Sequence, residues 1–487
     1  MVLIYKIFTM NIEAVIGLEI HAQLNTKTKM FCRCKNDSFD AIPNTNVCPV
    51  CMGFPGQLPV LNKEALNLAI KAGIAFNLEI LDEFKMDRKN YFYPDNPRGF
   101  QISQYDKPLS KNGYISLISN EDNTEQVVRI NRIHIEDDAG KLTHFNDFSL
   151  IDFNRAGIPL IEIVSEPDIR SSEQAVLYAK EIQKILKYLN ISDADMEKGM
   201  FRFDASISVR ESGDNKLNKR AEIKNLNSFK FLSLALDYEF NRQKELYLNG
   251  ELLEKELTLG FDETSFKTFF LRDKEQSLDY RYFTEPDIPN ISIASKEIFE
   301  QKKNISKLPA DKKKEYLSLG MSEEEATFIS SNNKFVIYFD KILKETGDLK
   351  LCLNFFNNIL IQYLKENFLD ISEQKIKSEN MIELINLVKK GVISTTQAKN
   401  DVFPVMFEDG LSASEVISKK AISQISDTDF IEKICKEIIN QNTESVDLIK
   451  SGKDRVLGYL VGLVMKETKG KANPSMVSAI LMKLINS

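Results

Sequence analysis

Histidine and long apolar segments are scarce in this sequence. Its 487 residues include three histidines, His21, His134 and His144. No segment approaches the roughly 18 consecutive apolar residues of a membrane-spanning helix, so we expect no membrane association. The opening MVLIYKIFTMN lacks a charged start and a small-residue cleavage site, and we therefore expect a cytoplasmic protein without a secretion signal.

The common nucleotide-binding and hydrolase motifs are also missing. The sequence has no G-x-x-x-x-G-K-[ST] phosphate loop, no G-x-G-x-x-G fingerprint and no H-E-x-x-H zinc motif. It has no G-x-S-x-G nucleophile elbow either. If this protein is an enzyme that handles a nucleotide, carboxylates, a metal ion and scattered basic residues must do the work by positioning and charge neutralisation.

Charge is distributed unevenly along the chain. The formal net charge of −7 argues against a general nucleic-acid coat. Residues 448–487 nevertheless contain seven Lys or Arg against two acidic residues. A basic end on an acidic body suits a segment that contacts phosphates, although a solvated helical end explains the charge equally well.

Five short segments alternate apolar with polar residues. They are AVIGLEIHAQL (14–24), RIHIED (132–137), PLIEIV (159–164), RFDASISVR (202–210) and AEIK (221–224). A period of two predicts strands that pack one face on a core and present the other to a polar partner. The polar positions gather Glu, His and Asp with isolated Arg and Lys, which is the inventory of a divalent-metal and phosphate site. They include Glu19, His21, His134, Glu136, Glu162, Arg202, Asp204, Glu222 and Lys224.

Some of these residues also have a purely structural interpretation. Glu162 could be a strand-edge carboxylate paired with Arg155, because structural ion pairs of this kind are common. His134 and His144 are more simply read as structural residues than as ligands. The structural interpretation is weaker for Glu19 and His21, because a second pair, His134 and Glu136, repeats the same combination on another strand.

Cysteines cluster near the start of the chain. Four of the six lie within twenty residues in the spacing C-x-C-x13-C-x2-C, namely Cys32, Cys34, Cys48 and Cys51. This spacing favours a closed tetrahedral zinc knuckle at 32–51 over four free thiols, and disulfides are disfavoured in a chain without a secretion signal. A zinc ion with four thiolate ligands has no open position, so we expect it to stabilise the fold. Cys352 and Cys435 lie alone in helical segments and should be core residues.

The pattern of secondary-structure signals changes near the middle of the sequence. Strand and helix signals mix up to about residue 295, including a helix expected at 171–189 with a Ser cap. A second is expected at 227–247, with an apolar stripe of Phe231, Leu234, Ala235 and Tyr238. Beyond about residue 295 Lys/Glu-rich helical periodicity takes over. We predict an α+β protein with a catalytic cradle of mixed or antiparallel sheet at 1–295, an all-helical linking domain at 296–410 and a small helical tail at 411–487.

Taken together, motifs along nearly the whole chain closely resemble one family, the B subunits of the glutamine-dependent aspartyl/glutamyl-tRNA(Asn/Gln) amidotransferases. The matching stretches follow the order of the family and are VIGLEIHAQL, CRC with NVCPVCMGFPGQLPVLN, RKNYFYPDNPRGFQISQYD, IHIEDDAGK, DFNRAGIPLIEIVSEPD, EIKNLNSF, RDKEQSLDYRYFTEPDIP and GKDRVLGYLVGLVMKETKGKANP. A match of this extent is far more specific than any single motif.

The resemblance implies a reaction and its partners. Such subunits use ATP to phosphorylate the side-chain carboxylate of Glu or Asp misattached to tRNA(Gln) or tRNA(Asn), and then present the acyl phosphate to ammonia. The ammonia comes from glutamine hydrolysis in an amidase-type A subunit, and a small C subunit completes a heterotrimer. A separate source of ammonia would explain why the sequence carries no hydrolase nucleophile motif.

The resemblance also implies roles for individual residues. It makes Glu19, His21, Glu136, Glu162 and Asp204 the catalytic set, and assigns Mg²⁺ to the first four of them, with Asp204 and Glu222 as further candidates. The candidates for holding phosphate or the substrate carboxylate are Arg155, Arg202, Lys224 and Asn225. The residues implied to line the nucleotide and aminoacyl pocket are Lys89, Tyr91, Gln101, Ser103 and Gln104. Those implied to meet tRNA phosphates are Lys453, Arg455, Lys466, Lys469 and Lys471.

Two other functions compete with this one. A non-enzymatic, zinc-containing tRNA-binding scaffold would keep the fold without the kinase step. Several carboxylates that face one another repel and so destabilise a fold, and tRNA binding alone does not require them. A distinct ATP-dependent ligase or kinase acting on a small acid would have no evident use for the basic tail or the cysteine knuckle.

Overall fold

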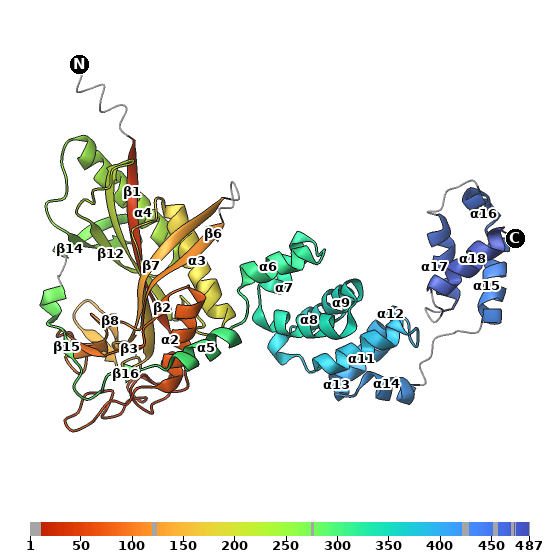
Figure 1. Ribbon diagram of the computed structural model, residues 1–487, viewed down its shortest axis with the longest axis horizontal. Helices are drawn as coiled ribbons and strands as arrows, with labels where there is room; N and C mark the ends of the chain where they lie inside the picture. The colour runs from red at the N-terminus through yellow and green to blue at the C-terminus, as the bar shows by residue number, and fades with distance from the viewer. Residues whose placement is uncertain are drawn as a thin grey trace, which may run out of the picture. The chain divides into compact units, whose positions relative to one another are not determined.

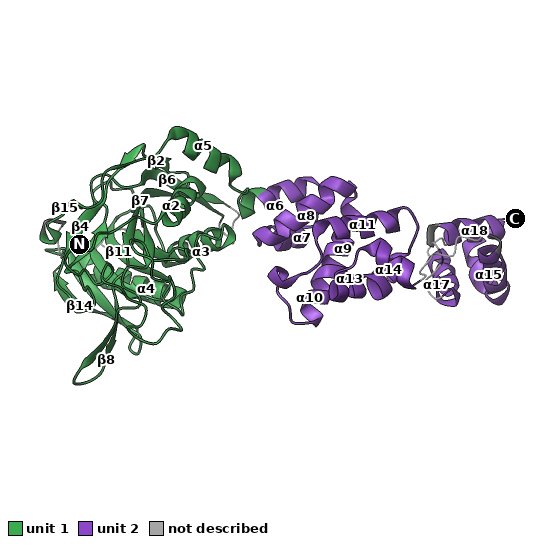
Figure 2. Ribbon diagram, turned by 90° about the horizontal axis from the view of Figure 1, so that it is seen from below, with its two compact units in different colours: residues 1–311 green, residues 312–487 purple. Residues whose placement is uncertain are grey.

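The structure is a computed structural model. It describes residues 11–118, 124–273, 277–420, 428–450, 456–468, 472 and 474–486. The chain divides into two compact units, Met1–Asp311 and Lys312–Ser487 (Figure 2). Among those residues no helix is both long and apolar enough to cross a membrane. The domain boundaries expected at 295 and 410 stay predictions.

A nine-stranded sheet forms the centre of the first unit (Figure 1). Its strand order is β14-β13-β12-β11-β1-β10-β7-β6-β2, and every neighbouring pair is antiparallel except β12 with β13. The strands are β1 Ile12–Gln23, β2 Glu79–Ile80, β6 Ser110–Ile118, β7 Glu125–Asp137, β10 Pro159–Ser165, β11 Phe201–Glu211, β12 Ala221–Leu226, β13 Leu257–Asp262 and β14 Lys267–Asp273. This mixed sheet, with the helical second unit, confirms the α+β class.

The first unit also contains three smaller sheets. One has the order β15-β4-β5, and the others pair β16 with β3 and β8 with β9. Contacts between β5 and β7 place the first of these beside the large sheet. The strands are β3 Glu83–Phe84, β4 Asp87–Asn90, β5 Phe100–Ser103, β8 Lys141–His144, β9 Ser149–Asp152, β15 Phe283–Thr284 and β16 Ile291–Ser292.

One face of the large sheet is apolar and covered by helices. In β1 the side chains of Ile16, Leu18 and Ile20 are buried, while Glu19 and His21 between and beyond them point to the other face. The helices of this unit are α2 Lys63–Ala75, α3 Ser172–Tyr188, α4 Phe229–Leu248 and α5 Ser295–Asn304, with the 3₁₀ turn η1 Ser277–Tyr280. Contacts of α3 with β1 and of α4 with β11 close the apolar face and leave the polar face available for a site.

The two covering helices form where the sequence predicts them. Ser171 caps α3 by accepting a hydrogen bond from the backbone N–H of Gln174 at 3.1 Å, which confirms the expected Ser cap. Ser228 caps α4 through Phe231 N–H in the same way. The Phe203 ring on β11 stacks on Phe229 of α4 with 5.8 Å between ring centroids, so helix and sheet share one aromatic contact in the core.

The named elements of the second unit, among its described residues, are all helices. Its elements up to residue 420, with α6 beginning just ahead of the unit boundary, are α6 Pro309–Ser318, α7 Glu323–Ser330, α8 Asn333–Thr346, α9 Leu349–Phe355, η2 Phe356–Ile361, α10 Gln362–Glu366, η3 Ile371–Glu373, α11 Ser378–Lys389, α12 Thr395–Gln397, η4 Ala398–Val402, α13 Phe403–Asp409 and α14 Ala413–Lys420. Cys352 of α9 is fully buried, as expected for a core cysteine.

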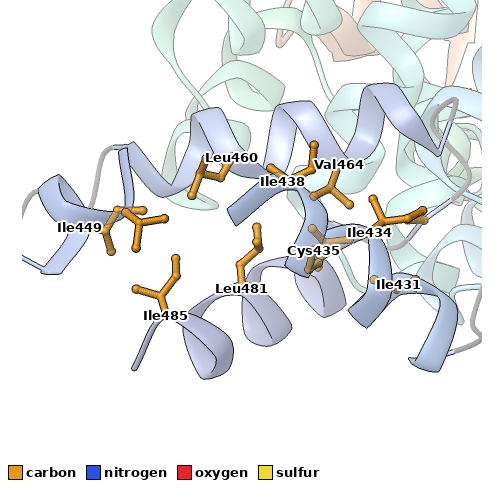
Figure 3. Packing of buried hydrophobic residues seen from close by; sticks show 12 residues of the cluster. Ile431, Ile434, Cys435, Ile438, Ile449, Leu460, Val464, Leu481 and Ile485 are labelled. Carbon is orange, nitrogen blue, oxygen red and sulfur yellow. The ribbon is translucent and has the colours of Figure 1, made fainter. Parts of the chain in front are cut away.

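Four helices near the end of the chain share a separate apolar core. They are α15 Thr428–Gln441, α16 Thr443–Lys450, α17 Leu457–Glu467 and α18 Pro474–Asn486. Figure 3 shows Leu460 and Val464 of α17 facing Cys435 of α15 and Leu481 of α18. Cys435 is fully buried there, which confirms its expected place in a core.

Candidate active site

Five adjacent strands, β12, β11, β1, β10 and β7, bring the polar positions together. His21 on β1 is directly opposite Glu162 on β10 and, on its other side, opposite Arg202 on β11. Glu162 is in turn opposite His134 on β7. Glu19, two residues before His21, is opposite Asp204. Because alternate residues of a strand share a face, the predicted polar positions form one continuous polar surface.

The first acidic cluster consists of His21, Glu136 and Glu162. The His21 Nε2 atom lies 3.6 Å from Glu136 Oε1 and 3.5 Å from Glu162 Oε2. One potential ligand atom from each of these residues lies within 4.8 Å of the others. Ser103 donates a hydrogen bond to Glu136 Oε2 at 3.0 Å, and His134 Nε2 lies 2.7 Å from Glu162 Oε2. Both carboxylates are therefore fixed in position by neighbours on other strands.

Glu162 is held in its ionised form. Burial alone would raise the pKa of its carboxyl, but His134 and His21 together lower that pKa well below its ordinary value. For His21, burial alone would lower the pKa, whereas the hydrogen bond and charge of Glu162, aided by Glu136, raise it. The cluster thus contains a negative charge at the position where a cation would be held.

The second acidic cluster consists of Glu19, Asp204 and Glu222, again with ligand atoms within 4.8 Å of one another. Lys224 Nζ lies 2.7 Å from Asp204 Oδ2 and 3.1 Å from Glu222 Oε1. Burial, followed by the charge of Glu162, raises the pKa of the Glu19 carboxyl. The single ammonium of Lys224 therefore faces a larger negative charge than it can balance.

A β-bulge shapes this second cluster. Between the pairs Phe203 with Leu226 and Ala205 with Ile223, two residues of β12 face one residue of β11. The bulge places Asn225 in the left-handed region with φ 59°, and its backbone N–H donates to Asp204 Oδ1 at 2.9 Å. This geometry turns Asp204 and its neighbours toward the polar face.

Two arginines are anchored at the end of β7 by a residue that the sequence analysis did not assign. Asp138 accepts two hydrogen bonds from Arg202, at 2.8 and 3.1 Å, and its Oδ2 atom lies 3.6 Å from Arg155 Nε. Arg155 also donates to the carbonyl oxygens of Ala139 and Gly140. Although burial would raise it, the two guanidinium groups lower the pKa of Asp138 to about 2. The signal was the acidic run that follows Glu136 in IHIEDD.

The five residues expected to line a pocket differ in their surroundings. Lys89 Nζ lies 5.0 Å from the centre of the Tyr280 ring, and both Lys89 and Tyr91 line open cavities. Gln101 donates to the carbonyl oxygen of Asp137 at 2.7 Å. The buried side-chain amide of Gln104 forms hydrogen bonds with the backbone of Lys85, Leu109 and Ile135. It therefore stabilises the wall of the cleft. Their proposed substrate contacts stay predictions.

Two cavities meet over the clusters. One has a volume of about 540 Å³ and reaches Glu19, Glu222, Lys224 and a tyrosine-rich wall that includes Tyr280 and Tyr282. The other has a volume of about 370 Å³ and is lined by residues of both clusters and by both arginines. Its acidic and basic lining residues include Glu19, His21, Lys89, Glu136, Asp138, Arg155, Glu162, Arg202, Asp204 and Lys224. Glu19, Lys89, Glu162 and Lys224 line both cavities, so the two form one cleft.

The four clustered cysteines converge at a separate position. All of their sulfur atoms lie within 4.8 Å of one another, and Cys48 Sγ is 3.9 Å from Cys51 Sγ. Sulfur atoms bound to one tetrahedral zinc at about 2.3 Å are roughly 3.8 Å apart, so the observed spacing fits that ion. The backbone N–H of Cys48 donates a hydrogen bond to Cys51 Sγ, with 3.2 Å between nitrogen and sulfur. A hydrogen bond with Cys32 lowers the pKa of the Cys51 thiol, and the charge of Lys29 adds to the effect.

The donor atoms of the acidic clusters fit a hard divalent cation. Carboxylate oxygens dominate both clusters, as Mg²⁺ prefers, and the one imidazole would suit Mn²⁺ equally well. Like charges brought this close repel each other unless a cation lies between them.

One of the five basic residues expected to meet tRNA belongs to the described part of the chain. Lys453, Arg455, Lys469 and Lys471 lie outside the described residues. Lys466 is exposed in the last turn of α17. The expected contacts with tRNA phosphates stay predictions.

Two family profiles match the chain. The profile for the GatB/GatE catalytic domain matches residues 14–299, which include both acidic clusters and the cysteine cluster. The profile for the GatB domain matches residues 337–485.

Proteins similar over almost their full length share one description, the B subunit of an aspartyl/glutamyl-tRNA(Asn/Gln) amidotransferase. The one from Persephonella marina is 45% identical over 98% of this chain and 100% of its own length. Those from Clostridium botulinum and a Thermotoga species are 44% and 42% identical, over 97% and 98% of this chain and 98% and 99% of their own lengths. The chain therefore belongs to the GatB/GatE family of amidotransferase B subunits.

Proposed function

We propose that this chain amidates the side chain of Glu or Asp misattached to tRNA, using ATP and ammonia, as the cytoplasmic catalytic component of a larger enzyme. Its family is one of tRNA-dependent amidotransferases, which are ligases. The observation that carries the proposal is the single cleft in which two acidic clusters face Lys89, Lys224, Arg155 and Arg202. A site of this kind can bring anions together and neutralise them.

The reaction needs two transfers. Oxide is a very poor leaving group, so ammonia does not displace it from a carboxylate. In the first transfer a carboxylate oxygen of the tRNA-bound residue attacks the γ-phosphorus of ATP, the bond from phosphorus to the ADP oxygen breaks, and ADP leaves. In the second the ammonia nitrogen attacks the acyl carbon, the carbon–oxygen bond to phosphate breaks, and a proton is released from nitrogen. The products are ADP, inorganic phosphate and the amide.

The chain's own residues would hold the reactants in this cleft. We assign one Mg²⁺ to His21, Glu136 and Glu162, and the second cluster of Glu19, Asp204 and Glu222 would hold another. When bound, the metal supplies positive charge that lets two anionic substrates approach. Burial opposes protonation of Lys224, but Asp204 and Glu222 raise its pKa, so it stays cationic and able to bind a phosphate or carboxylate oxygen.

The arginines are suited to one end of the cleft. The carboxylate of Asp138 orients the Arg202 guanidinium through two hydrogen bonds, and backbone carbonyls hold Arg155. We assign them to anionic oxygens of the substrates, because guanidinium groups bind carboxylate and phosphate in a fixed geometry. Lys89 and Tyr91 line the same space.

Zinc and partner subunits complete the proposal. Cys32, Cys34, Cys48 and Cys51 would hold a structural zinc, whose four thiolates leave no coordination position for a substrate. The relatives are described as one subunit of an amidotransferase, which implies further subunits. We propose an amidase-type A subunit as the ammonia source, a small C subunit, and tRNA bound by the basic end of the chain.

A zinc-containing tRNA-binding scaffold without enzymatic activity is less well supported. The carboxylates of Glu136 and Glu162 are buried and supported by Ser103 and His134, an arrangement that a binding protein does not need. An ATP-dependent enzyme acting on a small acid would make the helical end of the chain dispensable.

The test is reconstitution of the full enzyme. The purified chain is combined with its A and C partners, Mg²⁺, labelled ATP, glutamine and either Glu-tRNA(Gln) or Asp-tRNA(Asn). ADP release and conversion of the attached residue to Gln or Asn are measured. Conversion that needs both ATP and glutamine supports the proposal. Tight tRNA binding without ADP above background supports the scaffold. Loss of this activity on deletion of residues 411–487, with ATP binding intact, would favour the tRNA enzyme over one that acts on a small acid.

A further inference from the structure

A fully buried lysine lies next to the cysteine cluster. Lys29, in the loop after β1, is 0% exposed and is one of the largest buried side chains of the chain. Its Nζ donates a hydrogen bond of 2.8 Å to the carbonyl oxygen of Asn46. No carboxylate among the residues that the structure describes forms an ion pair with it. A buried lysine without a compensating negative charge is rare, so the balancing charge must lie elsewhere.

The nearest group that can carry this charge is a cysteine sulfur. Lys29 Nζ lies 3.9 Å from Cys51 Sγ, within reach of a hydrogen bond to sulfur. The backbone N–H of Lys29 donates to the carbonyl oxygen of Cys34 at 2.9 Å. Lys29 thus contacts the first cysteine pair through its backbone and the second pair through its side chain.

The environment on the remaining side fixes the lysine in place. Gly157 has φ +88°, and a Cβ atom there would lie 3.3 Å from Cys51 Cβ and 3.5 Å from Lys29 Cδ. The backbone of Gly157 therefore packs against the lysine stem and the cysteine together. Gly157 also accepts a hydrogen bond from Met30 N–H at 2.8 Å, which ties the lysine loop to this wall. The ammonium has little freedom to point anywhere but at Asn46 and Cys51.

Charge balance gives this contact a purpose. Four thiolates around one divalent cation carry a net charge of −2, and burial makes such a charge costly. We propose that Lys29 is a positioning residue of the cysteine cluster, whose ammonium donates to the Cys51 thiolate and offsets part of the charge of a tetrathiolate zinc centre. This inference rests on the proposed zinc site. Groups outside the ligands that hydrogen-bond them typically change metal affinity by about 10–100-fold.

The experiment compares Lys29→Met with wild type and with Lys27→Met, a control at an exposed lysine of the same loop. Zinc content is measured on the purified full chain, and zinc release is timed with an excess of a colorimetric chelator. The thiolate-to-metal charge-transfer band is recorded after replacement by Co²⁺. We expect Lys29→Met to release zinc about tenfold faster. Its cobalt band should move to longer wavelength, because the thiolate loses a donated hydrogen bond. Lys27→Met should match wild type.

Each result separates the two hypotheses. Release at the wild-type rate with an unchanged cobalt band in Lys29→Met overturns the role of Lys29 while leaving the zinc site intact. A wild-type chain without zinc and without a thiolate–cobalt band overturns the zinc site itself. Since a buried apolar substitution can prevent folding, Lys29→Gln is measured in parallel. It keeps a donor for the Asn46 carbonyl but has no charge, and release as slow as wild type from this variant would equally overturn the proposal.

Discussion

Glu162 and His134 are directly opposite each other on β10 and β7, and their side chains meet with 2.7 Å between Oε2 and Nε2. The Nδ1 atom of His134 has no partner among the residues that the structure describes. The imidazole is therefore oriented by its contact with Glu162, and Glu162 in turn by the imidazole. His134, which the sequence suggests is structural, thus supports the proposed metal site from outside it.

This contact predicts that His134 strengthens the binding of Mg²⁺. In His134→Leu the Glu162 carboxylate loses its partner, and the Mg²⁺ concentration for half-maximal ADP release should rise about tenfold. The rate at saturating Mg²⁺ should change less. His134→Gln, whose amide nitrogen can replace Nε2, should restore much of the affinity. The measurement is tRNA-dependent ADP release over a Mg²⁺ titration, and identical curves for Leu and wild type would contradict the assignment.

Glu136 should be indispensable for the phosphoryl transfer. Glu136→Gln keeps the shape of the side chain and the contact with Ser103 but removes the charge. The rate of ADP release should therefore fall by more than about 100-fold, which exceeds the effect expected for a residue that only hydrogen-bonds a metal ligand. Thermal stability and tRNA affinity should stay close to wild type. Ser103→Ala, which removes only the 3.0 Å hydrogen bond to Glu136, should cost about tenfold. A fully active Glu136→Gln enzyme would exclude Glu136 from the metal site.

Lys224 should stabilise the metal-free site. Removal of its ammonium in Lys224→Met leaves Glu19, Asp204 and Glu222 to repel one another, and we expect a loss of roughly 2 kcal/mol in the free energy of unfolding. Mg²⁺ should reverse part of this loss by replacing the missing charge. Thermal unfolding with and without Mg²⁺ measures both effects, with the exposed Lys219→Met as control. Equal destabilisation in both conditions would show that no cation enters the cluster.

The strand pattern was predictable because it depends on local chemistry. Alternation in β1 and β11 places Glu19 and Asp204 on the polar face of each strand, and pairing of the strands then brings them together. The bulge at Asn225 was not predictable, because it arises from the pairing of β12 with β11. Nor was the role of Asp138, since the fold alone brings Arg202, 64 residues away, to its carboxylate.

The apolar stripe of α4 shows the same limit of prediction from sequence. The sequence suggests a stripe of Phe231, Leu234, Ala235 and Tyr238, of which Ala235 is buried and the other three are half-buried. The buried face is rotated and contains Leu232, Ala235, Leu236, Glu239 and Gln243. The Glu239 carboxylate can be buried because Arg242, Gln243 and Thr268 donate hydrogen bonds to it. Thr268 lies on β14, so no window around the helix reveals this partner.

Acid should weaken the first unit through Asp168. Arg129 donates three hydrogen bonds to its carboxylate, two from the guanidinium at 2.8 and 2.7 Å and one from the backbone N–H at 3.0 Å, and thereby lowers the pKa of Asp168. A carboxyl with a lowered folded-state pKa stabilises the fold above its unfolded pKa of about 4. That stability is lost as the pH falls through the lower folded pKa, because the unfolded chain takes up the proton first.

The measurement compares wild type with Asp168→Asn in thermal unfolding across pH. Wild type should have the higher Tm at neutral pH, and the difference should shrink once the pH falls below about 4. Asp147→Asn, at an exposed carboxylate, is the control and should show no such convergence. A Tm difference that stays constant into strong acid would exclude Asp168 as the source.

The cysteine cluster should matter more for folding than for catalysis. Cys48→Ser removes one of the four proposed zinc ligands and the contact of 3.9 Å between Cys48 Sγ and Cys51 Sγ. If the site holds zinc, the variant should bind it weakly and its Tm should fall by several degrees. Turnover per folded molecule should fall less, because no cysteine faces the cleft that holds Glu136. Zinc content, Tm and the rate of tRNA amidation are measured together, with the exposed Asp40→Asn in the same loop as control. Stability and zinc content equal to wild type would make the zinc site untenable. A loss of turnover larger than the loss of folded protein would show that the cysteine cluster takes part in the reaction.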